Sequence, residues 1–195
     1  MAGAVMPVAQ VIPDAVATVT FFIGSSLYLI GASAQVLGEF VASRRARSSP
    51  HGTTRSMARW SLVGGAVQAV GALLFQTNLT AAFARDLSIA QQERLLWVPD
   101  LLGSVLFLTA SAIFFRLHRP IQGRKEDGDQ RHLALLNIIG SAFFIVSAVG
   151  AYVSPLTGEE IYPMIANLGT LIGALFFLIS SLPGLPRRSV GAVTR

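Results

Sequence analysis

The residues of this chain that could do chemistry are few, and they lie within long apolar stretches. Gln68 stands inside one stretch, while Gln35 and Glu39 would share a face of another if it is helical. A polar group inside a membrane segment is a functional hypothesis by default. Gln68 can also simply hydrogen-bond a neighbouring helix, and Glu39 can pair with Arg44 or Arg45. We expect these packing and pairing roles, with a polar path as the alternative.

A second polar group lies where several apolar stretches begin or end. Asp100 and Asn167, with Gln76 and Asn78, could form a shallow polar vestibule on one side of a membrane. Asp100 has a simpler explanation, because the helix dipole stabilises a carboxylate in the first helical turn. The candidate residues of a path for a small solute or ion are Gln35, Glu39, Gln68, Asp100 and Asn167.

Nothing in the sequence predicts catalysis, a cofactor or a metal ion. The chain has no cysteine, which excludes thiol nucleophiles, disulfides and cysteine-ligated metals. His51, His118 and His132 fall in or beside expected loops and lack the close spacing of zinc ligands. The sequence has no glycine-rich phosphate loop and no Ser/His/Asp arrangement that its spacing supports. We therefore expect no enzymatic activity.

These polar residues belong to an unusually apolar chain. Its 195 residues are 52% hydrophobic and 13% charged, whereas soluble domains carry about 25% charged residues. A helix that crosses a bilayer needs roughly 20 apolar residues, and five stretches approach or exceed this length. The sequence predicts an all-α integral membrane bundle that forms one domain over residues 1–195, with a short basic tail at 184–195. The expected helices are residues 15–38, 60–82, 99–115, 133–153 and 163–182.

The basic residues predict how the bundle is oriented. With five crossings, residues 39–59, 116–132 and 183–195 lie on one side and carry five, five and three of the fifteen Lys and Arg residues. The other side carries only two. Because cytoplasmic loops are rich in Lys and Arg, we expect the N-terminus outside and the C-terminus in the cytoplasm. The basic inner loops should lie against anionic lipid headgroups.

A repeated signature links the five helices, because each contains a glycine followed four residues later by an aromatic residue. The pairs are Gly24/Tyr28, Gly71/Phe75, Gly103/Phe107, Gly140/Phe144 and Gly173/Phe177. Residues four apart share a helix face. Little hydrophobic force acts between helices in lipid, so small residues that permit close contact favour association. We expect helix packing at Gly24, Gly71, Gly103, Gly140, Gly169 and Gly173; the alternative is that the glycines line a solute path.

Three stretches resemble the YrhK-like domain family of small bacterial membrane proteins. They are PDLLGSVLFLTAS (99–111), NIIGSAFFIVSAVGAYV (137–153) and NLGTLIGALFFLISSL (167–182). A looser similarity covers FFIGSSLYLIGAS (21–33) in the first helix. The resemblance implies the fold and a membrane location. It implies no activity, cofactor or functional residue, because the family is largely uncharacterised.

The sequence thus predicts a multi-pass protein of the bacterial cytoplasmic membrane with a structural or helix-interaction role. Its expected partners are the lipid bilayer and a second copy of itself or another membrane protein, not nucleic acid. The alternative function is a small solute or ion carrier or channel, which would use the polar groups of the first two helices and the outer polar cluster.

Overall fold

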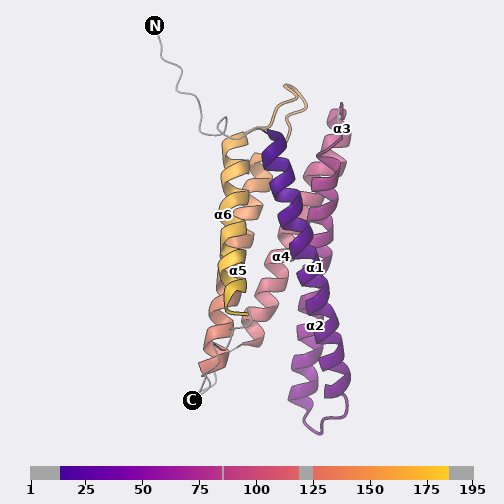
Figure 1. The fold of residues 1–195 in the computed structure, drawn as a ribbon, viewed down its shortest axis with the longest axis vertical. Helices are drawn as coiled ribbons and strands as arrows, with labels where there is room; N and C mark the ends of the chain where they lie inside the picture. The colour runs from indigo at the N-terminus through magenta and orange to yellow at the C-terminus, as the bar shows by residue number, and fades with distance from the viewer. Residues whose placement is uncertain (1–13, 85, 119–124, 185–195) are drawn as a thin grey trace, which may run out of the picture.

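The computed structural model describes residues 14–84, 86–118 and 125–184, and most of these residues are helical (Figure 1). The described residues contain no strand beyond a single β-bridge. The elements are α1 (Asp14–Ala46), α2 (Gly52–Ala81), α3 (Ile89–Gln92), a π-helical turn (Glu93–Trp97), α4 (Val98–Leu117), α5 (Lys125–Gly150), α6 (Pro163–Ser181) and a 3₁₀ turn (Leu182–Gly184).

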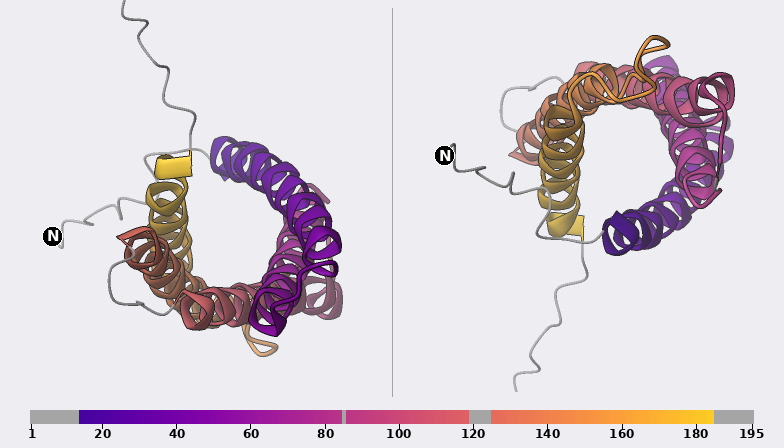
Figure 2. Two further views of the ribbon diagram at one scale, coloured as in Figure 1. Left: turned by 90° about the horizontal axis from the view of Figure 1, so that it is seen from below. Right: turned by 90° about the horizontal axis from the view of Figure 1, so that it is seen from above.

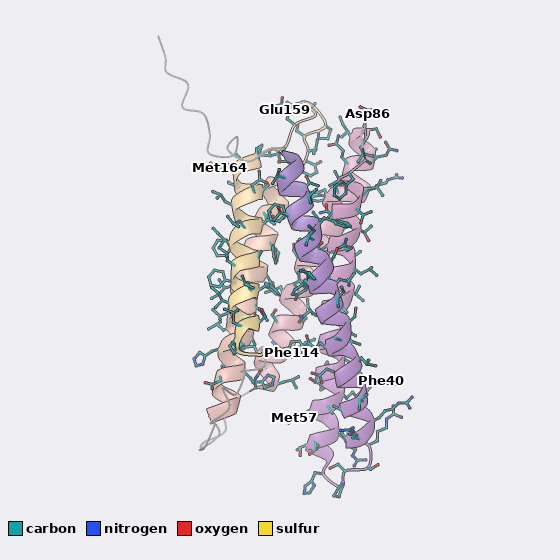
Figure 3. The ribbon with its side chains drawn as sticks, viewed as in Figure 1. Phe40, Met57, Asp86, Phe114, Glu159 and Met164 are labelled. Carbon is teal, nitrogen blue, oxygen red and sulfur yellow. The ribbon has the colours of Figure 1, made fainter. Side chains whose placement is uncertain are left out.

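Five helical rods are long and apolar enough to cross a membrane. One of them is continuous through α3, the π-helical turn and α4, over Ile89–Leu117. The loops alternate between the two ends, so that Asp86 and Glu159 lie at one end and Phe40 and Met57 towards the other (Figure 3). The predicted all-α bundle of five spanning helices is confirmed, and the protein is a multi-pass membrane protein.

α6 agrees with its expected range to within one residue, whereas the other four rods extend at one or both ends beyond the ranges expected from apolar residues alone. α1 continues to Ala46 rather than ending at residue 38, and the third rod begins at Ile89 rather than at residue 99. At 1.5 Å per residue, the 33 residues of α1 span about 50 Å, against about 30 Å of hydrocarbon. The ends of α1 therefore project beyond the lipid core, where polar residues can continue a helix. Of the predicted basic tail, residues 185–195 lie outside the described residues.

The rods stand side by side in an arc (Figure 2). Contacts follow chain order, with α1 against α2, α2 against α4, α4 against α5, and α5 against α6. Short connections place consecutive helices antiparallel as neighbours. α1 and α6 therefore form the two ends of the arc.

A proline explains the irregular turn before α4. Pro99 has no N–H to donate, and the ladder adjusts just before it, where the Val98 N–H bonds the Glu93 carbonyl in the wider π pattern. The indole N–H of Trp97 in this turn donates to the Ala148 carbonyl on α5 over 2.9 Å. Its ring also meets Tyr152 edge-on, with centroids 5.0 Å apart. Trp97 thereby fixes the start of α4 against the end of α5.

The alternation of loops gives a direct test of the five crossings, because the natural chain has no cysteine to remove. Ser49→Cys lies between α1 and α2, and Thr157→Cys lies between α5 and α6. We expect an impermeant maleimide to label Thr157→Cys in intact cells and Ser49→Cys only after the membrane is opened. Labelling of both positions in intact cells, or of neither, would contradict five crossings in the predicted orientation.

Candidate functional site

Five aromatic side chains, one from each spanning helix, meet inside the arc. Phe107 lies within 6.0 Å, centroid to centroid, of each of the other four rings. Tyr28 also meets Phe177 at 5.7 Å, and so joins the two end helices of the arc. Edge-on and tilted rings at these distances attract one another beyond their buried area. The cluster, called here the aromatic centre, is Tyr28, Phe75, Phe107, Phe144 and Phe177.

These five residues are the aromatic members of the glycine–aromatic pairs seen in the sequence. The sequence places each ring four residues after a glycine but does not show that the rings converge. Convergence follows from their common position on each helix face together with the arc, which directs every such face inward. The common spacing was therefore the signal that could have predicted the aromatic centre.

In α2 and α4 the glycines and rings interlock reciprocally. A Cβ added at Gly71 would lie 3.1 Å from Phe107 and 3.1 Å from the Gly103 carbonyl oxygen. A Cβ at Gly103 would lie 2.9 Å from Phe75 and 3.1 Å from the Gly71 carbonyl oxygen. Each glycine thus makes room for the partner helix's ring and for its backbone.

The α5–α6 pair repeats this arrangement. A Cβ at Gly140 would lie 2.8 Å from Phe177 and 2.9 Å from the Gly173 carbonyl oxygen; a Cβ at Gly173 would lie 2.8 Å from Phe144 and 2.9 Å from the Gly140 carbonyl oxygen. Gly169 is equally close-packed, since its Cβ would lie 2.8 Å from that of Ser147. The bundle therefore contains two helix pairs that use one packing device.

Hydroxyl and amide groups join α5 and α6 further. The Ser147 hydroxyl donates to the Ala166 carbonyl and lies 2.7 Å from the Thr170 hydroxyl. The Ser180 hydroxyl donates to the side-chain oxygen of Asn137. Such bonds between membrane helices average about 0.6 kcal/mol, so close packing provides most of the attraction. Sequence analysis did not identify Asn137 and Ser180 as partners, because they are far apart in the chain.

At Gly24 the structure differs from the expectation of helix packing. A Cβ at Gly24 would meet nothing within 4 Å, and the same is true of Gly31 and Gly38 on the same helix. All three glycines are exposed. The reason is topological: α1 stands at one end of the arc and packs mainly against α2, so this glycine face has no neighbouring helix.

Gln68 forms a hydrogen bond between two helices. Its amide N–H donates to the Tyr28 hydroxyl over 2.8 Å and so connects α2 to the aromatic centre. Nearer the other end of α2, Gln76 accepts hydrogen bonds from Ser25 and Ser26 of α1, at 2.6 and 3.3 Å. The two glutamines therefore bind α1 to α2, and Gln76 is occupied rather than facing an open vestibule.

Gln35 and Glu39 lie on the face of α1 that also carries Tyr28 and Ala32, and both are half-buried. The expected ion pair of Glu39 with Arg44 or Arg45 is absent from the described residues. The Arg44 guanidinium instead lies over the Phe40 ring, 4.6 Å from its centroid. A Cβ added at Gly65 of α2 would lie 3.7 Å from the Cγ of Glu39. The stem of the Glu39 side chain therefore packs beside α2, and its carboxyl group has no partner charge among the described residues.

The five candidate residues of a polar path are not brought together. Asp100 is in the first turn of α4 and Asn167 in the second turn of α6, both towards the end of the bundle where α3 begins (Figure 1). Gln35 and Glu39 lie in the half of α1 towards the opposite end. Gln68 lies between these groups and bonds Tyr28. The aromatic centre thus separates the two polar groups.

The contacts of this site pack helices together and hydrogen-bond them to one another. The described residues contain no group of three or more His, Asp or Glu side chains placed to hold a metal ion. In the same residues, every buried side-chain nitrogen or oxygen has a hydrogen-bond partner. Hydrogen bonding is therefore complete for the fully buried polar side-chain atoms in this part of the chain.

Comparison with protein-family models, with curated proteins and with solved structures finds no match to this chain. The similarity to the YrhK-like family therefore stays a prediction from the sequence stretches.

Two glycine substitutions separate packed glycines from open ones. Gly140→Ala should destabilise the protein by about 1–3 kcal/mol, because the added methyl meets a ring and a backbone carbonyl. Gly24→Ala is the matched control, and it should be neutral or stabilising by about 0.5–1 kcal/mol, because alanine favours a helix over glycine. Thermal unfolding of both variants in detergent measures the difference. Equal stability of the two variants would contradict the packing described for Gly140.

Proposed function

We propose that this protein acts in the bacterial cytoplasmic membrane by helix contact, without catalysis. In this proposal the exposed glycine face of α1, defined as Gly24, Gly31 and Gly38, binds a helix of a second copy or of another membrane protein. Its role is structural, holding membrane proteins together.

The observation that carries the proposal is the difference between α1 and the other helices. In the other helices the glycines of the signature contact a neighbouring ring and backbone, whereas the α1 glycines have open space. Only 6% of the apolar window of α1 is buried, against 22–39% in the other four spans. The three glycines recur every seven residues, the spacing at which one face follows a left-handed helix pair. Small residues on such a face permit close helix approach in lipid.

The interior supports contact over transport as the function. A carrier or channel would need a polar route along the bundle, and the aromatic centre occupies the inside of the arc instead. Gln68 is bonded to Tyr28, and the signature glycines of α2, α4, α5 and α6 are closed against their neighbours. Of the residues considered for a polar path, Gln68 therefore contributes to the cohesion of the bundle.

Charge supports the assignment to the cytoplasmic membrane and the proposed orientation. At one end the α1–α2 hairpin carries basic residues, among them Arg44, Arg45 and Arg55. At the other end the loops carry Asp86 and Glu159 (Figure 3). The basic end is expected in the cytoplasm because positive loops are retained there.

Energy transfer between two differently labelled populations of the protein in lipid vesicles tests the proposal. We expect transfer that grows with the protein-to-lipid ratio, and we expect Gly31→Leu to reduce it at least fivefold by blocking close approach. Leu37→Phe is the control, because it adds bulk elsewhere on the same exposed helix and should leave the transfer unchanged.

The unfolding temperature of Gly31→Leu should be no lower than that of the natural chain, since a Cβ there meets nothing within 4 Å among the described residues and leucine favours a helix over glycine. Absence of transfer in the natural chain would restrict the partner to another membrane protein, and photo-crosslinking from Gly31→Cys in native membranes then decides. Only lipid adducts at Gly31→Cys would overturn the proposal.

A further inference from the structure

The outer surface of α4 contains a hollow that the packing of the bundle does not use. Its volume is about 300 Å³, and it is lined by Leu108, Thr109, Ala112, Ile113 and Arg116. The residues of α4 that enter the bundle, Gly103, Phe107 and Ser111 among them, are buried on a different face. The hollow is therefore on the side of the helix that faces lipid.

Side-chain size and hydrogen bonding make the floor of this hollow apolar. Thr109 and Ala112 are small and lie between the larger Leu108 and Ile113. The Thr109 hydroxyl donates to the Val105 carbonyl over 2.8 Å, so its proton is already used within the helix. An acyl chain can thus lie along the floor without leaving a donor unpaired.

Arg116 provides the only charge in the lining. It is exposed in the last turn of α4, beyond the uncharged part of the span. Arg44 and Arg131 place their guanidinium groups over the rings of Phe40 and Phe115. Arg116 has no ion pair, hydrogen bond or ring contact within the described residues. Within the described residues, therefore, no group takes up its five N–H donors, which can bind an external acceptor.

We propose that this hollow binds one anionic phospholipid. The phosphate group pairs with the Arg116 guanidinium, whose planar fork matches phosphate oxygens, and one acyl chain lies over Thr109 and Ala112. Charge complementarity and the place of the arginine at the end of the apolar run favour a phospholipid with a net negative charge over one whose headgroup is neutral overall. The site is separate from the glycine face of α1, so either proposal can fail without the other.

Native mass spectrometry of the delipidated protein with added phosphatidylglycerol or phosphatidylcholine, with identical acyl chains, tests the site. We expect the first phosphatidylglycerol to bind about fivefold more tightly than the first phosphatidylcholine, as one arginine near a headgroup implies. Arg116→Gln should remove this preference, while Arg116→Lys should keep part of it. Ala112→Leu fills the hollow and should weaken the binding of both lipids.

Arg55→Gln is the matched control, because Arg55 is also exposed and is placed at the same end of the bundle on α2. It should leave the preference unchanged. Three results would overturn the site: a preference that survives Arg116→Gln, an equal loss with Arg55→Gln, or displacement of the lipid by inorganic phosphate while Ala112→Leu has no effect. The last result would indicate that Arg116 attracts the headgroup but that no acyl chain lies in the hollow.

Discussion

Close contact between backbones is the interaction on which this bundle depends. Lipid removes most of the hydrophobic force between helices, so dispersion and a few hydrogen bonds must hold them. Each signature glycine of α2, α4, α5 and α6 lets a carbonyl of the neighbouring helix come within about 3 Å of where a side chain would start. The same gap receives the neighbouring ring. Because glycine has no side chain, both the backbone and the ring of the neighbouring helix can come close to it.

The two interlocked pairs explain why α1 differs from the other helices. α2 pairs with α4 and α5 with α6, each through reciprocal glycine and ring contacts. α1 contributes Tyr28 to the aromatic centre and hydrogen bonds to Gln68 and Gln76 of α2. Its glycines have no reciprocal partner. Because the other four helices interlock in two pairs, α1 is left without a reciprocal partner in the bundle. The proposed contact with a helix outside the bundle would supply that partner.

Much of the fold could be predicted from composition, because the need for long apolar helices in a bilayer is strict. The five rods and their antiparallel order followed from the uncharged runs and the short loops. The bounds of α6 were predicted to within one residue, but the starts of the second, third and fourth rods were not, since polar residues such as those of Ile89–Trp97 continue a helix outside lipid. The glycine–aromatic spacing was visible, but the sequence could not show that Gly24 lacks a neighbour, because that depends on where the arc ends.

The contacts of the polar residues could likewise be predicted only in part. Gln68 was expected to bond a neighbouring helix, and the structure places its amide at Tyr28. The pairing expected for Glu39 was wrong: Arg44 lies over the Phe40 ring instead, and the stem of Glu39 packs beside Gly65 of α2. Glu39, Arg44 and Arg45 are close together in the sequence, but the Arg44 guanidinium contacts the Phe40 ring instead of the Glu39 carboxylate.

Each packed glycine is required by the ring that faces it, and a double-mutant cycle at Gly103 and Phe75 tests this dependence. Gly103→Ala should cost about 1–3 kcal/mol in the natural chain, because its methyl would lie 2.9 Å from the Phe75 ring. In a Phe75→Leu background the same substitution should cost at least about 1 kcal/mol less, since the ring is gone. An equal cost in both backgrounds, measured by unfolding in the same detergent, would contradict the account.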